Sequence, residues 1–323
     1  MRRGVMLSNY LIAFLIIISL NFMLPRLMPG DPLQAIFGEE ALIAMTPELK
    51  AQLNERFALD QTMGEQLISY LLNLFRGDLG YSYYYNAPVT EILMGALPWT
   101  LLLVGSALVL STVLGVVLGI ESGWRRGGAG DRTLLVGLTM LNGFPDFFLG
   151  MLLLLVFGVT LNVLPLSGAV TPYAGLTGWA LVVDVLRHLA LPLGALTLAG
   201  VTGSYLLTRN TMLGVLRAPF VLLARAKGLS PGVIRYRHAG RNSMLPVVTR
   251  TGVRAGRMAT GVLFVEMVFA YPGLGHLVNT ALSTRDYPVL HGVFLIVTVS
   301  VLLINFLTDL LYPRLDPRVA HAH

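Results

Sequence analysis

The residues with the clearest chemical potential are acidic side chains that interrupt otherwise apolar tracts. Asp146 interrupts the tract over residues 133–160, and Glu266 interrupts another tract further along the chain. An ionisable group within a membrane is costly and often serves in a transport path. Asp146, Asn142 and Glu266 are therefore candidate pathway residues. A structural reading, in which the carboxylates bond to neighbouring helices, is the favoured alternative for both acids.

Other kinds of site chemistry find little support in the residue types. The chain has no cysteine, so thiolate metal sites and thiol nucleophiles are excluded. It contains neither H-E-x-x-H nor G-x-x-x-x-G-K-[ST], which argues against a zinc hydrolase and against ATP binding by that loop. His321 and His323, near the chain end, are interpreted as an unstructured tail. We predict no catalytic and no metal site.

The segment over residues 209–257 carries ten basic residues and no acidic residue. The pattern predicts a short helix over 219–227 that ends at Gly228, because glycine is favoured where a helix closes in a left-handed conformation. Ser230-Pro231 then predicts the N-cap and first position of a second helix. This arrangement suits docking into a soluble partner, or equally a helix resting on anionic lipid.

Composition places these residues in a membrane protein. Hydrophobic residues make up 55% of the 323 residues and charged residues 12%, against roughly 25% charged residues in soluble domains. A soluble chain of this size could not cover its surface with so few charges. The net charge is +6, but no basic stripe interleaves with aromatic residues, so nucleic-acid binding is not predicted.

Six apolar tracts are candidates for helices that cross a bilayer. The fifth is short unless its helix begins near Leu245, in which case Arg250, Arg254 and Arg257 share one face and reach the headgroups. We predict an all-α integral membrane protein, a single transmembrane domain over residues 1–323. Its six predicted spans cover residues 4–25, 92–120, 133–160, 189–208, 258–271 and 287–308.

The distribution of charge predicts the orientation of these spans. With both termini in the cytoplasm, the inside segments hold 17 of the 23 basic residues and three acidic ones, as the positive-inside rule requires. Segment 209–257 is then cytoplasmic and segment 25–97 extracytoplasmic. The latter predicts two short helices, one beginning at Thr46-Pro47-Glu48 and one over residues 63–75.

Motifs in the basic segment and along the chain carry a family resemblance. A-R-A-K-G-L-S (224–230) and R-H-A-G-R-N-S-M-L-P (237–246) look like the coupling loop of ABC-importer permeases, in particular the dipeptide, oligopeptide and nickel branch. One departure is that Leu222 and Leu223 stand where that wider family often has an acid and an alanine. Further matching motifs occur in order: M-P-G-D-P (28–32), R-G-D-L-G (76–80), L-P-W-T-L (97–101), L-P-L-S-G (164–168) and V-E-M-V-F-A-Y-P-G-L-G (265–275).

The resemblance implies a division of labour among several chains in the inner membrane. This chain and a second homologous permease subunit would form the translocation path and bind no cofactor. Two ATP-binding cassette subunits would hold ATP and magnesium, and an extracytoplasmic substrate-binding protein would deliver the cargo. The resemblance places ATPase coupling at Ala224, Arg225, Ala226, Lys227, Gly228, Leu229 and Ser230, with His238, Arg241 and Asn242 bracing the second helix against the first.

The resemblance leaves the cargo open. Dipeptides or oligopeptides are the first choice. In the path, Asp146 would attract a peptide's amino group or a metal cation. Nickel or a metal chelate is the alternative within the same family. An ATP-independent carrier or channel would not need the basic coupling segment, and an intramembrane hydrolase lacks a nucleophile with a partner base.

Overall fold

The computed structural model describes residues 2–26, 43, 45–56, 62–82 and 84–315. Every regular element within these ranges is a helix, and their one β-type contact is a bridge between Tyr81 and Pro88. The all-α architecture predicted from the apolar tracts is confirmed. The chain divides into two compact units, residues 1–98 with 272–302 and residues 99–271 with 303–323. The prediction of one permease domain stays a prediction.

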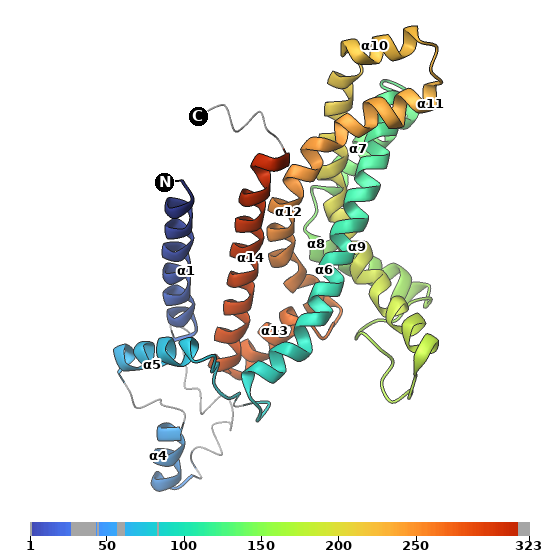
Figure 1. Ribbon diagram of the computed structural model, residues 1–323. Coiled ribbons are helices and arrows are strands. Elements are labelled where there is room, and N and C mark those ends of the chain that lie inside the picture. The colour runs from blue at the N-terminus through green and yellow to red at the C-terminus, as the bar shows by residue number, and fades with distance from the viewer. Residues whose placement is uncertain (1, 27–42, 44, 57–61, 83, 316–323) are drawn as a thin grey trace. The chain divides into compact units, whose positions relative to one another are not determined.

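Unit 1 is held together by side chains from α1, α5 and α14. The ring of Phe22 lies 5.6 Å from that of Tyr70 and 5.7 Å from that of His291. The Asn21 amide also donates to the Thr298 hydroxyl at 3.2 Å. The elements of this unit are α1 (Arg2–Arg26), α4 (Pro47–Arg56), α5 (Met63–Phe75), the start of α6 (Val89–Trp124), α13 (Leu274–Thr284) and most of α14 (Tyr287–Leu315) (Figure 1).

The two short helices α4 and α5 begin where the sequence predicts them. The Thr46 hydroxyl accepts the backbone N–H of Leu49, which satisfies one of the unpaired donors at the start of α4. Thr62 and Glu65 form a capping box at the start of α5, and their hydrogen bonds lower the pKa of the Glu65 carboxyl. α5 spans the predicted residues 63–75.

Unit 2 contains the remainder of α6 and a longer set of helices. α10 and α11 protrude together at one end of this unit (Figure 1). α11, η2 and α12 follow one another without a gap, so they form one continuous helical segment. The elements are α7 (Ala129–Leu141), α8 (Asp146–Leu153), η1 (Leu154–Thr160), α9 (Gly178–Val215), α10 (Pro219–Ala226), α11 (Pro231–Val233), η2 (Ile234–Gly240), α12 (Arg241–Val268) and the end of α14.

Three helices in the described ranges are long and apolar enough to cross a membrane, namely α6, α9 and the Tyr287–Thr308 part of α14. The α7 and α8–η1 pair makes a fourth if it counts as one broken span. α1 contributes a shorter apolar stretch, Ser8–Met23, and α12 includes residues 258–268 of the predicted fifth span. The chain is thus an all-α protein with multiple apolar spans, and the count of six stays a prediction.

The third predicted span is not one straight helix, which corrects the sequence analysis. α7 ends at Leu141, α8 begins at Asp146, and the axes of the two parts differ by 103°. Pro145 explains the break, because proline lacks a backbone donor and restricts the residue before it to extended conformations. Asp146 therefore stands at the start of a helix beside a bend, not in the middle of a straight helix.

A row of glycines allows α6 to lie against α9. A Cβ atom on Gly115 would stand 2.8 Å from the Val201 carbonyl oxygen, and one on Gly119 would stand 2.8 Å from the Tyr205 carbonyl oxygen. Gly123 continues the row against Met212. Gly115 and Gly119 are spaced as a G-x-x-x-G pair, a motif that serves close packing of membrane helices, and here the pair packs against α9.

Substituting Gly119 with alanine is expected to destabilise unit 2, although alanine favours helix formation. The added methyl group would overlap α9 backbone atoms, and overpacking of this kind costs about 1–3 kcal/mol. Gly105→Ala on the same helix is the matched control, because nothing lies within 4 Å of its Cβ position. Apparent melting temperatures in detergent should fall for Gly119→Ala and stay level or rise for Gly105→Ala. Equal values for the two variants would contradict the packing argument.

Candidate functional site

The first predicted coupling helix is α10, and it ends as the sequence predicts. Gly228 has φ +71°, a left-handed conformation that glycine adopts without a Cβ penalty. Its N–H donates to the Arg225 carbonyl at 2.9 Å, and the Leu229 N–H donates to the Ala224 carbonyl at 3.3 Å. These two bonds form a Schellman motif, which satisfies carbonyls at the end of α10 and reverses the chain.

The second coupling helix begins at Ser230 and leads directly into α12. Ser230 occupies the N-cap position with extended backbone angles, and Pro231 is the first helical residue. η2 then approaches α6 closely: a Cβ atom on Gly240 would lie 3.0 Å from Ile120. At the other side, three residues separate α9 from α10. A displacement of α10 would therefore reach both α9 and α12 through short, ordered connections.

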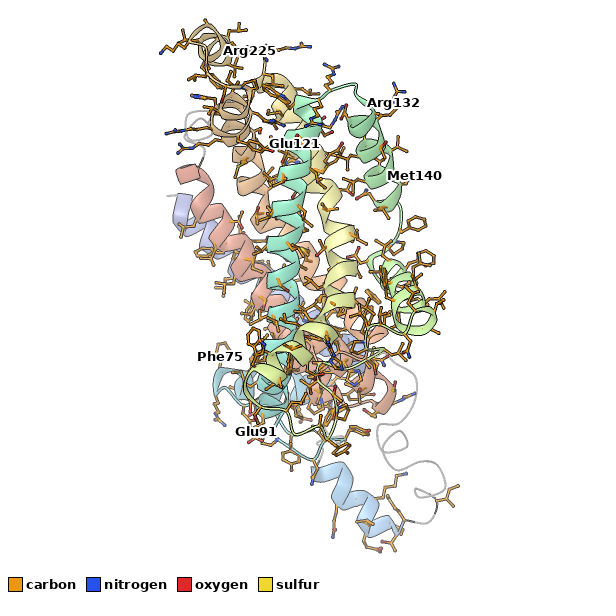
Figure 2. All side chains as sticks on the ribbon, turned by 90° about the vertical axis from the view of Figure 1, so that its right-hand side faces the viewer. Phe75, Glu91, Glu121, Arg132, Met140 and Arg225 are labelled. Atoms are coloured by element: carbon orange, nitrogen blue, oxygen red, sulfur yellow. The ribbon has the colours of Figure 1, made fainter. Side chains whose placement is uncertain are left out.

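Apolar side chains pack α10 against the rest of unit 2. Val221 and Ala224 are buried, whereas Leu222 and Leu223 on the same helix are 55% and 56% exposed. α10 thus has a buried face and an apolar exposed face, and Arg225 stands on its protruding end (Figure 2). The buried cluster beneath it comprises Val116, Ile120, Met212, Val221, Ala224, Ile234, Ala239 and Val247.

The polar brace predicted between the two helices stays a prediction. The Asn242 amide donates to the backbone carbonyl of His238, one turn earlier in its own helical segment, at 2.7 Å. The Arg241 side chain is exposed. Among the described residues, the apolar cluster links α10 to η2. A direct role of His238, Arg241 and Asn242 in coupling also stays a prediction.

A carboxylate at the end of α6 ties that helix to η2. Glu121 accepts two hydrogen bonds from Arg235 at 2.7 and 2.8 Å, and the Tyr236 hydroxyl donates to the same carboxylate. The bond to Glu121 raises the pKa of the Tyr236 phenol, because it stabilises the protonated form. The Arg235 guanidinium also lies 5.6 Å from the centre of the Trp124 ring. The sequence analysis did not identify this cluster.

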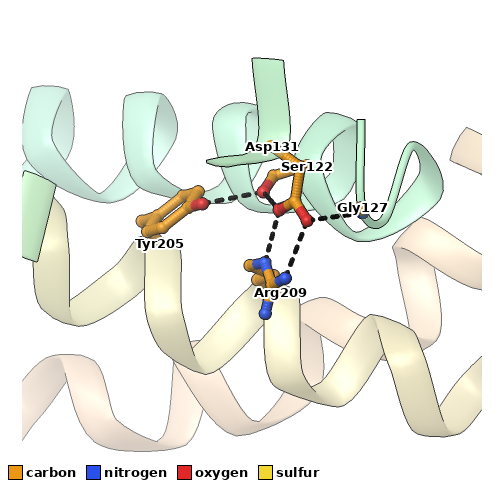
Figure 3. Close-up of polar contacts among 5 residues, drawn as sticks. All are labelled: Ser122, Gly127, Asp131, Tyr205 and Arg209. Atoms are coloured by element: carbon orange, nitrogen blue, oxygen red, sulfur yellow. Dashed lines mark hydrogen bonds and ion pairs between the residues drawn. The ribbon is translucent and has the colours of Figure 1, made fainter. Parts of the chain in front are cut away.

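A second network joins α6, α7 and α9, and the sequence analysis missed it too. Asp131 is 4% exposed and receives two hydrogen bonds from Arg209, at 2.6 and 2.8 Å (Figure 3). The Gly127 N–H donates to the same carboxylate at 2.9 Å, and Ser122 links it to the Tyr205 hydroxyl. The signal available in the sequence is that Glu121 and Asp131 are two of the three acidic residues in the segments predicted to be cytoplasmic.

Only two of the three predicted pathway residues lie at the same place in the structure. Asn142 and Asp146 line the same cavity, on either side of the bend between α7 and α8. Glu266 is fully buried elsewhere and accepts a hydrogen bond from Thr100 at 2.7 Å, which links α12 to α6. The structural reading of Glu266 therefore fits its surroundings, and Asn142 and Asp146 remain the pathway candidates.

The cavity lies within unit 2 and has a volume of about 690 Å³. One wall of the cavity is formed by small residues of α9, namely Ala199, Gly200 and Gly203, which leave space there. Its other lining residues combine apolar, polar and charged side chains: Asn142, Asp146, Leu196, Ser204, Leu207, Val247, Arg250, Arg254 and Met258. A site of this size and composition can hold a small polar solute.

Arg254 points toward this cavity region, which corrects the prediction that it reaches the headgroups. Its guanidinium donates to the Gly200 carbonyl at 2.7 Å and to the Ser204 hydroxyl, both on α9. It also donates to Thr112 at 3.1 Å and Ser111 at 3.2 Å on α6. These acceptors are neutral, so they orient the guanidinium without cancelling its charge.

Comparison with known proteins agrees with this arrangement. The profile of the family described as "Binding-protein-dependent transport system inner membrane component" matches residues 111–321. The chain is 35% identical to the dipeptide transport system permease protein DppB of Escherichia coli (strain K12), over 95% of each chain. It is 34% identical to the di/tripeptide transport system permease protein DppB of Pseudomonas aeruginosa, over 94% of this chain and 93% of that protein.

A relative from Alkalihalophilus pseudofirmus, also a dipeptide transport system permease protein, is 33% identical over 99% of this chain and 98% of its own length. These matches include the coupling segment, the bend at Pro145 and the cavity. The chain belongs to the family of binding-protein-dependent transport system inner membrane components.

Proposed function

We propose that this chain is one of two permease subunits of an ATP-driven importer for short peptides in the inner membrane. The observation that carries the proposal is the α10–α11 segment, which protrudes from unit 2 and is joined directly to α9 and α12. Closure of ATP-binding subunits against α10 would move both helices as a lever. The names of the dipeptide and di/tripeptide relatives support peptides as the cargo.

The exposed surface of α10 supports a protein partner rather than lipid alone. Leu222 and Leu223 are exposed beside Arg225 and Lys227. A protein cleft would bury the leucines and supply acceptors for the two cations. ATP and magnesium would belong to that partner, and an external binding protein would deliver the peptide.

The metal-chelate alternative receives no comparable support. The described residues contain no group of three or more histidine, cysteine, aspartate or glutamate side chains that could hold a metal ion. A chelate could still cross without protein ligands, so the uptake assay includes a labelled nickel chelate as a second cargo.

The test is uptake by the assembled transporter. The chain would be co-expressed with its second permease and ATP-binding subunits, purified as a complex and reconstituted with the binding protein in liposomes. We expect uptake of a labelled dipeptide with ATP and none with ADP. Failure of ATP-binding subunits to co-purify, or equal uptake with ADP, would contradict the proposal and favour an ATP-independent carrier.

The absence of native cysteine allows a direct test of the proposed topology. Ser230→Cys should react with an impermeant maleimide only when the cytoplasmic face is open to the reagent. Thr62→Cys should react only from the opposite face. Labelling of both positions from one face would contradict six spans with cytoplasmic termini.

A further inference from the structure

The cavity in unit 2 contains opposite charges that are not paired with each other in the described part of the chain. The ion pairs among described residues involve Glu121, Asp131 and Asp184 as acids. Asp146, Arg250 and Arg254 line the cavity but take part in none of these pairs. Asp146 and Arg254 are partly buried. A partly buried charge without a counter-charge is costly, and a ligand of opposite charge would offset that cost.

The acidic end of the cavity is placed by the bend in the chain. Asp146 is the first residue of α8, and its carboxylate lies against Gly261 of α12. A Cβ atom on Gly261 would stand 2.6 Å from the carboxylate oxygen, so the glycine makes room for the acid. The Asp146 carboxylate therefore lies close to α12 at Gly261, and Gly261 has no side chain that could form a hydrogen bond with it.

The basic end is placed by α12 itself. Arg254 is oriented by acceptors on α6 and α9, and Arg250 lines the cavity one turn away. Positions 254 and 261 are seven residues apart, which corresponds to about 10 Å along a helix axis. Position 254 and the position beside Asp146 are therefore offset along α12 by about that length, and position 250 lies about 6 Å further along the helix.

This offset, roughly 10 Å to position 254 and 16 Å to position 250, suits a short peptide that makes a contact of about 3 Å at each end. An extended chain advances roughly 3.3–3.6 Å per residue, so two or three residues carry an ammonium and a carboxylate about 7–10 Å apart. A guanidinium binds a carboxylate with paired hydrogen bonds, and a carboxylate binds an ammonium. The wall of small residues between them (Ala199, Gly200 and Gly203) imposes no side-chain requirement.

We propose that this cavity is a zwitterion subsite that holds a peptide of two or three residues in transit, with Arg254 and Arg250 at its carboxylate and Asp146 at its ammonium group. The proposal rests on the proposed function and adds the groups of the peptide that this chain recognises. Because the subsite would bind the two termini of the peptide and not its side chains, it would accept peptides of varied sequence.

The experiment uses the complete transporter without the binding protein, which removes that protein's own selectivity. A dipeptide containing benzoylphenylalanine would be photolysed with the complex in nanodiscs, and the labelled segment identified by mass spectrometry. We expect label in α9 or α12, and competition by free Ala-Ala and Ala-Ala-Ala. N-acetylated, C-amidated and five-residue competitors should be at least about tenfold weaker, as expected for loss of a charge-assisted contact.

Variants of the cavity residues test which side chain binds each end of the peptide. Asp146→Asn, which keeps the side-chain shape, should reduce labelling about tenfold and abolish the preference for a free amino group over an acetylated one. Arg254→Lys keeps the charge and should retain more labelling than Arg254→Gln. Arg132→Gln, an exposed site on α7 (Figure 2), is the control and should behave as the native chain.

Two results separate the proposals. A native transporter that shows ATP-dependent uptake but labels no residue of α9 or α12, or that binds capped and free peptides equally, would overturn the subsite and leave the proposed function intact. A native transporter without any ATP-dependent peptide uptake would overturn the proposed function itself.

Discussion

Gly228→Val is expected to leave the chain inserted and assembled with its ATP-binding partners while most peptide uptake is lost. Gly228 has φ +71° and no heavy atom within 4 Å of its Cβ position, so the cost is backbone strain and not a collision. A left-handed conformation costs an L-residue about 1–2 kcal/mol, which changes the population of the native turn by a factor of roughly 5–30. α10 would then no longer transmit its displacement to α11 and α12.

The measurement is the ratio of peptide taken up to ATP hydrolysed in the same liposomes. This ratio should fall about fivefold or more for Gly228→Val. The ratio for Gly228→Asn should lie between those of the native chain and Gly228→Val, because asparagine tolerates left-handed angles better than valine. Gly232→Val is the matched control, since Gly232 also has open space around its Cβ but no positive φ. An unchanged ratio for Gly228→Val would contradict the lever.

Features that depend on neighbours in the sequence were predicted well. The Gly228 turn, the Ser230–Pro231 start and the bounds of α5 follow from capping rules that operate over three or four residues. The Gly115–Gly119 pair was also recognisable from spacing alone. Charge counts predicted an all-α membrane protein because lipid leaves few other ways to satisfy the backbone.

Features that depend on distant residues were not predicted. Asp131 and Arg209 are 78 positions apart. They belong to two segments that the charge distribution predicts to be cytoplasmic, and nothing in the sequence indicates that they are in contact. Arg254 was expected at the headgroups because a long cationic side chain can reach them, but neutral acceptors on α6 and α9 hold it inward. The bend at Pro145 has a local signal, because a proline restricts the backbone of the residue before it to extended conformations.

Asp131→Asn is expected to destabilise unit 2 by about 2–4 kcal/mol, the second large effect that the structure predicts. Asp131 accepts bonds from Arg209, Ser122 and the Gly127 backbone. An asparagine amide would direct N–H groups at donors and leave the half-buried Arg209 cation without its counter-charge. The apparent melting temperature in detergent should fall by roughly 5–10 °C. Arg132→Gln, at the neighbouring exposed position, should leave it unchanged.

The double variant Asp131→Asn with Arg209→Gln decides whether the charge imbalance is the cause. Removing both charges leaves no uncompensated cation, so the double variant should be more stable than Asp131→Asn alone. If the two single losses simply add, the carboxylate acts through its separate bonds to Ser122 and Gly127 and not through Arg209. The bidentate geometry in Figure 3 favours coupling, because both carboxylate oxygens contact the same guanidinium. This network would keep α6, α7 and α9 together while the α10–α11 segment moves.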